Sequence, residues 1–275
     1  MAVTRSHMPE LPEVEAAVRV LRAAAEGRTI VRARLIHRSL RARIAPSRLR
    51  SLVGARVDRI ERRGKHQLLH LTDGRALHAH FRMAGDWVVD RVPAQAPRFA
   101  RAVVELDDGA RIWLVDPRAL STLDVRDAAA RLELGLGPEA TDPALRARVL
   151  ADSLARRRGP LKPALLDQRL IAGLGNIYAA EALWAARLNP RAPAASLTQA
   201  ETARLLGAIR SVMRRALAGT IRFAVYGREA LPCRRCRTLV ARIVQAGRST
   251  YFCPYCQDRS RARAALTRSL RAAHP

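Results

Sequence analysis

The sequence contains no long hydrophobic run, and this absence excludes one class of protein at the outset. No window is apolar over the length that a membrane span needs. The opening Met1-Ala-Val-Thr-Arg-Ser-His7 also lacks the apolar core of a secretion signal. We therefore expect a cytoplasmic protein with no membrane partner.

Cysteine is scarce and is confined to one segment. The chain has 4 cysteines, and their pattern is Cys233-x2-Cys236-x16-Cys253-x2-Cys256. In a reducing compartment such a pattern points to metal rather than to disulfides. Each Cys-x-x-Cys turn offers two thiolates to one tetrahedral metal ion. The alternative is that the four cysteines are free thiols that bind no metal. Because sulfur would fill all four positions, we expect one structural Zn2+.

Acidic residues are few beside the basic ones. Lys and Arg number 50 and Asp and Glu 24, which gives a net charge of +26 and a pI near 11.7. Such an excess is typical of a protein that binds a polyanion, and nucleic acid is the obvious one. A genome biased towards arginine could also raise the charge. At 275 residues the chain has room for two modest domains.

Hydrophobic periodicity predicts an α+β chain. A helix is expected from Pro12, at the first helical position, to about Glu26-Gly27. Alternating residues and hairpin turns predict a β-sandwich with strands at 29–35, 56–60, 66–71, 75–81, 103–106 and 111–115. Helical spacing predicts helices at about 143–155, 162–170, 177–187 and 198–218, the last opening with the capping box Thr198-Gln-Ala-Glu201.

The stretch Met8-Pro9-Glu10-Leu11-Pro12-Glu13-Val14-Glu15 allows two interpretations. If the chain is processed to begin at Pro9, a secondary amine lies beside a carboxylate and can attack an aldehyde-type carbon. If it begins at Met1, the same nitrogen is an inert amide. The stretch also has the composition of a simple helix start, with acidic residues in the first turn.

A second motif combines Lys162-Pro-Ala-Leu-Leu-Asp-Gln168 with Gly173-Leu-Gly-Asn176-Ile-Tyr-Ala-Ala-Glu181. Its glycines allow close backbone approach between two helices. The free amides at the start of the second helix, together with Asn176, suit a phosphate. A plain helical hairpin with glycines for packing is the alternative.

With these motifs in order from Met8 to Cys256, the chain resembles the formamidopyrimidine-DNA glycosylase and endonuclease VIII family of base-excision repair enzymes. The resemblance implies an N-terminal β-sandwich with an amino-terminal helix, then a helix-two-turns-helix domain and a zinc ribbon. On this basis we expect a catalytic β-sandwich at 8–133, a linker at 134–143, a DNA-binding domain at 144–230, the ribbon at 231–257 and a basic tail at 258–275.

The resemblance also implies a role for particular residues. Pro9 matches the nucleophile and Glu10 the acid that moves protons at the sugar. Lys65 matches the lysine of β-elimination, and Arg248 the arginine of the second elimination and of phosphate binding. Arg157 and Asn176 match phosphate contacts, and Met83, Arg118 and Leu120 match the side chains that fill the space left by the everted base. Without the resemblance, Lys65 and Arg248 would be interpreted as solvated charges and Met83 as a core or turn residue.

Four features depart from the family pattern. Seven residues precede Met8, and we expect the functional protein to begin at Pro9. Leu120 replaces an aromatic residue, and Phe99 stands where the 8-oxoguanine branch often has a histidine. Only Thr220-Ile221-Arg222 separate Gly219 from Phe223, where that branch has a long loop over the everted base. This short connection favours ring-opened purines, oxidised pyrimidines or abasic sites over 8-oxoguanine. The Pro-Glu-Leu-Pro-Glu start instead matches the formamidopyrimidine branch, so the expected substrate class stays broad.

We therefore predict a bifunctional DNA glycosylase and AP lyase, acting as a monomer on damaged double-stranded DNA and associated with the nucleoid. It would excise formamidopyrimidine-type or other oxidised bases through a Schiff base at Pro9, followed by β,δ-elimination. Two alternatives stay open. One is a catalytically silent protein of the same fold that binds damaged DNA, and the other is an endonuclease VIII-like activity on oxidised pyrimidines.

Overall fold

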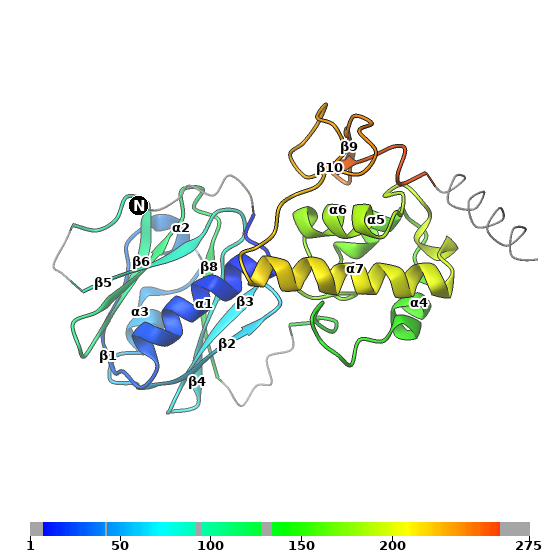
Figure 1. Cartoon of the computed structure of the whole chain (residues 1–275). Helices are drawn as coiled ribbons and strands as arrows, with labels where there is room; N and C mark the ends of the chain where they lie inside the picture. The colour runs from blue at the N-terminus through cyan, green and yellow to red at the C-terminus, as the bar shows by residue number, and fades with distance from the viewer. Residues whose placement is uncertain (1–7, 42, 92–94, 128–133, 259–275) are drawn as a thin grey trace, which may run out of the picture. The chain divides into compact units, whose positions relative to one another are not determined.

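The computed structural model describes residues 8–41, 43–91, 95–127 and 134–258. The seven residues before Met8 and all of the expected basic tail except Asp258 lie outside the described part. The chain divides into two compact units, residues 1–134 and 135–275 (Figure 1). Among the described residues, no helix is long and apolar enough to cross a membrane.

The first unit is built from two antiparallel sheets of four strands each. One sheet has the order β1-β6-β7-β5 and the other β2-β3-β4-β8 (Figure 1). The strands are β1 (Ile30–Leu35), β2 (Val57–Arg63), β3 (His66–Leu71), β4 (Arg75–His80), β5 (Asp86–Asp90), β6 (Ala100–Leu106), β7 (Arg111–Val115) and β8 (Thr122–Asp127). The helices are α1 (Leu11–Ala25), α2 (Arg38–Arg41) and α3 (Pro46–Arg50).

Helix α1 joins the core of this unit through one apolar stripe. Val14, Val18, Leu21 and Ala25 recur at helical spacing, and all four are buried against residues from both sheets. Arg19, on the opposite side, is exposed. The start of α1, with Pro9 and Glu10, is therefore anchored to the sandwich by hydrophobic burial along the rest of the helix.

The predicted strands are present, and two further strands were missed. The bounds of β3 and β7 are those predicted, whereas β2 extends to Arg63 and β6 begins at Ala100. The short edge strand β5 was not predicted, and neither was β8, which pairs with β4 far from it in sequence. Pro12 is the second residue of α1, because the helix begins at Leu11.

The second unit is helical and ends in a β-hairpin. Its elements are α4 (Ala147–Ala155), α5 (Leu161–Leu165), α6 (Asn176–Ala185), the 3-10 helix Ala194–Ser196, α7 (Gln199–Leu217), β9 (Ala241–Gln245) and β10 (Arg248–Phe252). Helix α6 is buried along Ile177–Leu183, because its sequence is apolar on nearly every side. The capping box of Thr198 and Glu201 opens α7 as predicted. Helix α5 is shorter than predicted and ends at Leu165.

Candidate functional site

Pro9 and Glu10 lie at the amino-terminal end of α1, and both are buried. Glu10 is the N-cap residue and forms a capping box with Glu13, in which its backbone N–H donates to Glu13 Oε2 at 2.9 Å. The Glu10 side chain accepts from the Glu13 backbone N–H. The carboxylate is thus held at the positive end of the helix dipole, on the residue that follows Pro9.

Lys65 lies in the tight turn between β2 and β3, and it is only 8% exposed. Gly64 before it has a φ of +58°, in the left-handed region that glycine adopts without strain. This turn closes a hairpin in which Arg63 pairs with His66. The amine is consequently carried by a short, well-defined turn of the first unit.

The three side chains expected to fill the space left by an everted base come from two loops that contact each other. Met83 lies in the turn after β4, and Arg118 and Leu120 lie in the loop between β7 and β8. Ser121 Oγ joins these loops, because it donates to Asp116 Oδ2 at 2.7 Å and lies 3.2 Å from Phe81 O.

Asp116 organises the loop that carries Arg118 and Leu120. This carboxylate is fully buried and accepts from the backbone N–H groups of Arg118, Leu120 and Ser121 at 2.7–2.9 Å. Arg118 is exposed, whereas Leu120 and Met83 are half-buried. The first unit thus presents one cation and two apolar side chains on adjoining, rigidly held loops.

In the second unit, a residue that was not among the predicted site residues joins Asn176 to the β9–β10 hairpin, which we call the zinc hairpin because it lies between the two cysteine pairs. Lys162 is 1% exposed, and its Nζ donates to Asn176 Oδ1, to Thr250 Oγ1 at 2.8 Å and to Ser249 O at 3.3 Å. The Asn176 side chain itself donates to Ser249 O at 3.0 Å. Arg248 is the neighbour of Ser249 and is exposed, so the two predicted phosphate contacts Asn176 and Arg248 are brought together.

Arg157 follows α4 and already has an acidic partner. Its Nη1 donates to Asp167 Oδ2 at 2.6 Å, and Arg169 binds the same carboxylate. Burial opposes ionisation of Asp167, but the hydrogen bonds from Arg169 and Arg157 lower its pKa to about 2. Arg157 is therefore oriented by an ion pair and is half-buried.

A second residue outside the prediction is Glu181, which holds the short connection after α7. It is 3% exposed and accepts from the backbone N–H groups of Ala224, Val225 and Tyr226 at 2.8–2.9 Å. A buried carboxylate with three N–H donors is a strong anchor for a loop. The motif that contains Glu181 was recognised in the sequence, but nothing local indicated its partners.

The four cysteines form the predicted metal site. Their Sγ atoms all lie within 4.8 Å of one another. The indole N–H of Trp184 donates to Cys233 Sγ at 3.4 Å, as the backbone N–H of Cys256 does to Cys253 Sγ. Burial and the neighbouring thiols raise the pKa of Cys256 to about 12, and a dication would offset the repulsion among four thiolates. This donor set fits one structural zinc ion.

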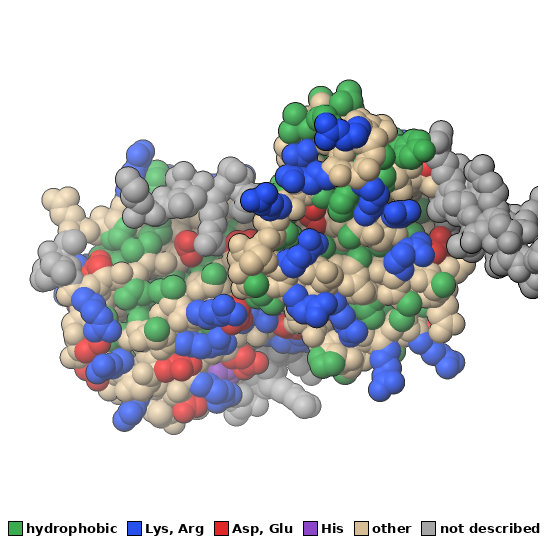
Figure 2. Space-filling view, viewed as in Figure 1, with side chains coloured by type: hydrophobic (Ala, Val, Ile, Leu, Met, Phe, Trp, Pro, Cys, Tyr) green, Lys and Arg blue, Asp and Glu red, His purple; other side chains and the backbone are tan. Residues whose placement is uncertain are grey.

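Cations surround these positions. Figure 2 shows Lys and Arg side chains over the visible surface of both units. The segment 231–257 contains no acidic residue, and all its arginines are exposed: Arg234, Arg235, Arg237, Arg242 and Arg248. The zinc hairpin is therefore suited to a phosphate backbone.

Three family models match the chain in succession. The formamidopyrimidine-DNA glycosylase N-terminal domain matches residues 8–123, the H2TH domain of the same enzymes residues 136–225, and the zinc finger found in FPG and IleRS residues 230–259. The sandwich with its amino-terminal helix, the helical domain and the four-cysteine site together define a DNA glycosylase of the helix-two-turns-helix class.

Individual relatives agree with these models. A formamidopyrimidine-DNA glycosylase of Paracoccus denitrificans is 41% identical, covering 91% of this chain and 100% of the relative. A Lactococcus lactis enzyme bound to DNA containing an AP site superposes with a TM-score of 0.86 at 28% identity, covering 91% of this chain and 100% of that chain. The MutM (Fpg) protein of Thermus thermophilus superposes with a TM-score of 0.80 at 38% identity, covering 90% of this chain and 98% of that chain. The chain belongs to the formamidopyrimidine-DNA glycosylase family.

Proposed function

We propose that this protein removes oxidised or ring-opened bases from duplex DNA with Pro9 as nucleophile and then cleaves the strand as an AP lyase. The solved relatives include Lactococcus lactis enzymes in complex with DNA containing an abasic site and with DNA containing Fapy-dG. Our proposal extends these substrates to this chain. It assigns catalysis to Pro9, Glu10, Lys65 and Arg248, and DNA binding to Met83, Arg118, Leu120, Arg157 and Asn176.

The observation that carries this proposal is the pairing of a buried proline and a buried glutamate at a helix start. The family match begins at residue 8, so the proline follows the first matched residue. The reaction requires a free secondary amine at Pro9. We therefore propose that the active form lacks residues 1–8.

The proposed chemistry conserves atoms and charge in five steps. The Pro9 nitrogen bonds to C1′ as the bond between C1′ and the damaged base breaks, and the base leaves with a proton. Glu10 moves protons at the sugar as its ring opens, which produces an iminium between Pro9 and C1′. Lys65 assists β-elimination, in which a C2′ proton is removed and the 3′ phosphate leaves. Arg248 assists δ-elimination, in which the C4′ proton is removed and the 5′ phosphate leaves. Hydrolysis of the iminium frees the enzyme.

Borohydride reduction of the iminium tests the nucleophile. With an abasic duplex, protein that begins at Pro9 should yield a covalent adduct whose DNA-linked peptide starts with Pro9. The matched control is the chain that retains residues 1–8, which should bind the duplex without trapping. Adduct formation and strand cleavage by protein with Met1 intact would contradict the assignment. Equal inactivity of both forms would favour the silent DNA-binding alternative.

Glu10→Gln tests the acid. The amide keeps the shape of the side chain but cannot exchange protons, so base release should fall by about 10²–10⁴-fold. Because Glu10 is not assigned to DNA binding, the Kd for the lesion duplex should change by less than about threefold. Base release at the parental rate would remove Glu10 from the mechanism.

The short connection after α7 supports a broad choice of lesion. Glu181 holds residues 224–226 by three hydrogen bonds, and only Thr220, Ile221 and Arg222 lie between Gly219 and Phe223. Such a segment has little length with which to enclose a base. We therefore propose that ring-opened purines, oxidised pyrimidines and abasic sites are processed better than 8-oxoguanine. Single-turnover rates on a panel of defined lesion duplexes test this order.

We also propose that the protein acts as a monomer in the cytoplasm, associated with the nucleoid. Both the assigned nucleophile and the assigned phosphate contacts belong to a single chain, and the high positive charge favours binding to chromosomal DNA. Sedimentation of the complex with a short lesion duplex should give a one-to-one stoichiometry.

A further inference from the structure

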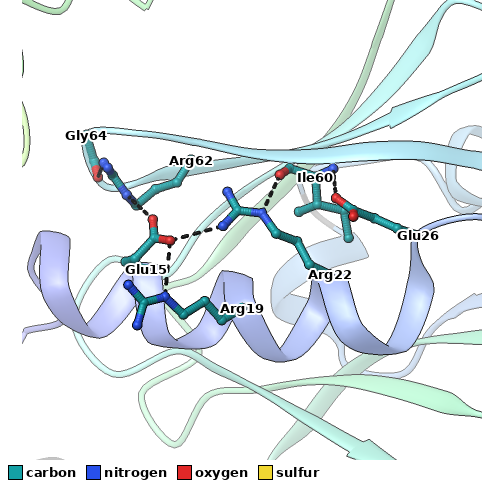
Figure 3. Close-up of polar contacts among 7 residues, drawn as sticks. All are labelled: Glu15, Arg19, Arg22, Glu26, Ile60, Arg62 and Gly64. Carbon is teal, nitrogen blue, oxygen red and sulfur yellow. Dashed lines mark hydrogen bonds and ion pairs between the residues drawn. The ribbon is translucent and has the colours of Figure 1, made fainter. Parts of the chain in front are cut away.

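A set of polar side chains connects helix α1 to strand β2, and we call it the α1–β2 clamp (Figure 3). It consists of Glu15, Arg22 and Glu26 on the helix and Ile60 and Arg62 on the strand. Arg62 Nε donates to Glu15 Oε2 at 2.8 Å, and Arg22 Nη1 donates to Glu15 Oε1 at 3.0 Å. Arg22 Nε donates to Ile60 O at 2.9 Å, and Ile60 N donates to Glu26 Oε1 at 2.7 Å.

The clamp occupies the open edge of a sheet. Strand β2 is the first strand of the order β2-β3-β4-β8, so no other strand of the described residues lies along its outer side. Arg22 and Glu26 satisfy both backbone groups of Ile60 on that side, as a partner strand would. Helix α1 therefore has a defined position along β2 that hydrophobic contacts alone would not determine.

The Glu15–Arg62 pair differs from a typical surface ion pair. The side chains are only 14% and 11% exposed, and each makes more than one polar contact. Burial opposes ionisation of Glu15, but the hydrogen bonds and charges of Arg62 and Arg22 lower its pKa overall. A shielded guanidinium–carboxylate pair of this kind restricts both partners in orientation as well as distance.

The pair connects the two groups to which the proposed function assigns catalysis in this unit. Glu15 lies on the helix whose start carries Pro9 and Glu10. Arg62 uses Nη1 to donate to Gly64 O at 3.1 Å, and Gly64 immediately precedes Lys65. A continuous series of direct contacts thus runs from α1 through Glu15 and Arg62 to the peptide that carries the Lys65 amine.

We infer that Glu15 and Arg62 are positioning residues that set the place of Lys65 relative to the Pro9–Glu10 pair. This inference rests on the proposed function. The iminium forms at Pro9 and the elimination is assisted by Lys65, so both groups must reach one sugar at once. Reactions between held groups are sensitive to small displacements, and an error of about 1 Å can reduce the rate about 100-fold.

Arginine at position 62 is a requirement of this arrangement. Its planar guanidinium reaches the Glu15 carboxylate through Nε and the Gly64 carbonyl through Nη1. A lysine keeps the positive charge but has one ammonium on a flexible stem, and it cannot hold both oxygens in the same geometry. Arg62→Lys therefore separates positioning from charge.

The test compares Glu15→Gln, Arg62→Lys and the double variant in protein that begins at Pro9. The matched control is Asp58→Asn, which breaks an exposed ion pair with Arg59 on the same strand. Base release, strand cleavage and borohydride trapping are measured under single-turnover conditions, with the enzyme in saturating excess over the lesion duplex. The duplex Kd and the thermal unfolding midpoint are measured alongside.

The rate of strand cleavage should fall at least about tenfold in each single variant. The rate of base release should fall less than the rate of cleavage, and the duplex Kd should stay within about twofold of the parental value. The double variant should be no slower than the slower single variant, because both changes break the same connection. Asp58→Asn should match the parent. A merely structural role would instead lower base release and cleavage equally, in proportion to the folded fraction.

Parental cleavage in both single variants would overturn the inference, as would a loss that follows the folded fraction or the Kd. If Glu15→Gln does not fold, Arg62→Lys alone decides, since it retains the buried charge. Failure of the parent to form any adduct contradicts the proposed function itself. Trapping by the parent with equal cleavage by the variants contradicts only the positioning role.

Discussion

At the scale of single residues, three histidines on one face of β3 and β4 are held in the uncharged form. His66 and His80 are paired in register, and His66 Nδ1 lies 2.8 Å from His78 Nε2. Burial is the main cause, and the nearby cations Arg82 and Arg126 add to it. The pKa values of His66 and His78 are lowered to about 4 and that of His80 to about 3.

This cluster predicts a loss of stability in weak acid. The unfolded chain binds protons at these histidines near the ordinary pKa of 6.5, whereas the folded chain does so only near 4. Stability is thus complete above pH 6.5 and falls as the pH drops towards 4. The unfolding midpoint should be at least about 4 °C lower at about pH 5 than at about pH 7.5. His78→Asn should reduce this difference, and an unchanged difference would exclude the cluster as its cause.

At Gly85 there is no room for a side chain, so adding one methyl group should disturb the loops that carry the expected DNA contacts. A Cβ there would overlap Ser121 Oγ and lie 2.9 Å from Phe81 Cδ1, at the junction of the two loops that carry Met83 and Leu120. Gly85→Ala should therefore lower the free energy of unfolding by about 1–3 kcal/mol in a urea titration.

The control for Gly85 is Gly207→Ala within α7. Apart from the adjacent residues and the backbone of α7 itself, no described atom lies within 4 Å of a Cβ added at Gly207, so the better helix propensity should stabilise the protein by about 0.5–1 kcal/mol. The interpretation of Gly85 as a site of close packing would be wrong if both changes had the same sign.

At the scale of elements, the β9–β10 hairpin depends on two different supports. The four cysteines hold its base, and Lys162 binds β10 through Ser249 and Thr250. Val244 of β9 is 66% exposed, whereas Phe252 of β10 is buried and Tyr251 packs against a small apolar cluster that includes Val240 and Cys253. We therefore attribute its order to the metal and the buried amine together with this small apolar cluster at its base.

Removing zinc with a chelator should disorder this hairpin and leave the first unit folded. Trp184 should report the change by fluorescence, because its indole contacts Cys233, whereas Trp87 and Trp113 belong to the sandwich. DNA binding should weaken by at least about tenfold, because Arg248 loses its fixed position. The control is a second addition of zinc, which should restore both signals. Full DNA affinity without metal would contradict this role for the ribbon.

The elements differ in how far the sequence could predict them. The turn Thr72-Asp73-Gly74 is a local signal, and the strands on either side of it, β3 and β4, were located almost to the residue. Strand β8 alternates in character but pairs with β4, from which it is remote in sequence. Because strand pairing of that kind depends on the closed sheet rather than on neighbouring residues, its place could not be deduced beforehand.

At the scale of the whole molecule, the net charge of +26 predicts binding that depends strongly on salt. Each phosphate contact releases a counterion, so log K should fall linearly with the logarithm of the salt concentration. Arg248→Ala should make that slope shallower by about 1, since it removes one exposed cation assigned to a phosphate. Substituting the arginine of an exposed surface pair, as in Arg59→Ala, is the control. If Arg248→Ala and the parent showed the same salt dependence of log K, the Arg248 side chain would not contact a DNA phosphate.

The sequence by itself determined those features whose chemistry depends on residues close together along the chain. The proline–glutamate start, the cysteine spacing, the excess of arginine and the capping box of α7 each lie within a few residues, and short-range geometry is enough to interpret them. Together they established the family, the zinc site and the division into sandwich and helices.

Only the tertiary structure decided which distant side chains meet. Lys162 reaches β10, Glu181 holds residues 224–226, Ser121 joins two loops and Arg62 connects α1 to the Lys65 turn. Each of these contacts joins residues separated by a long stretch of chain, so their pairing depends on how sheets and helices pack. The physical reason is that a buried polar group must find a partner in space, and spacing along the chain does not record where that partner will be.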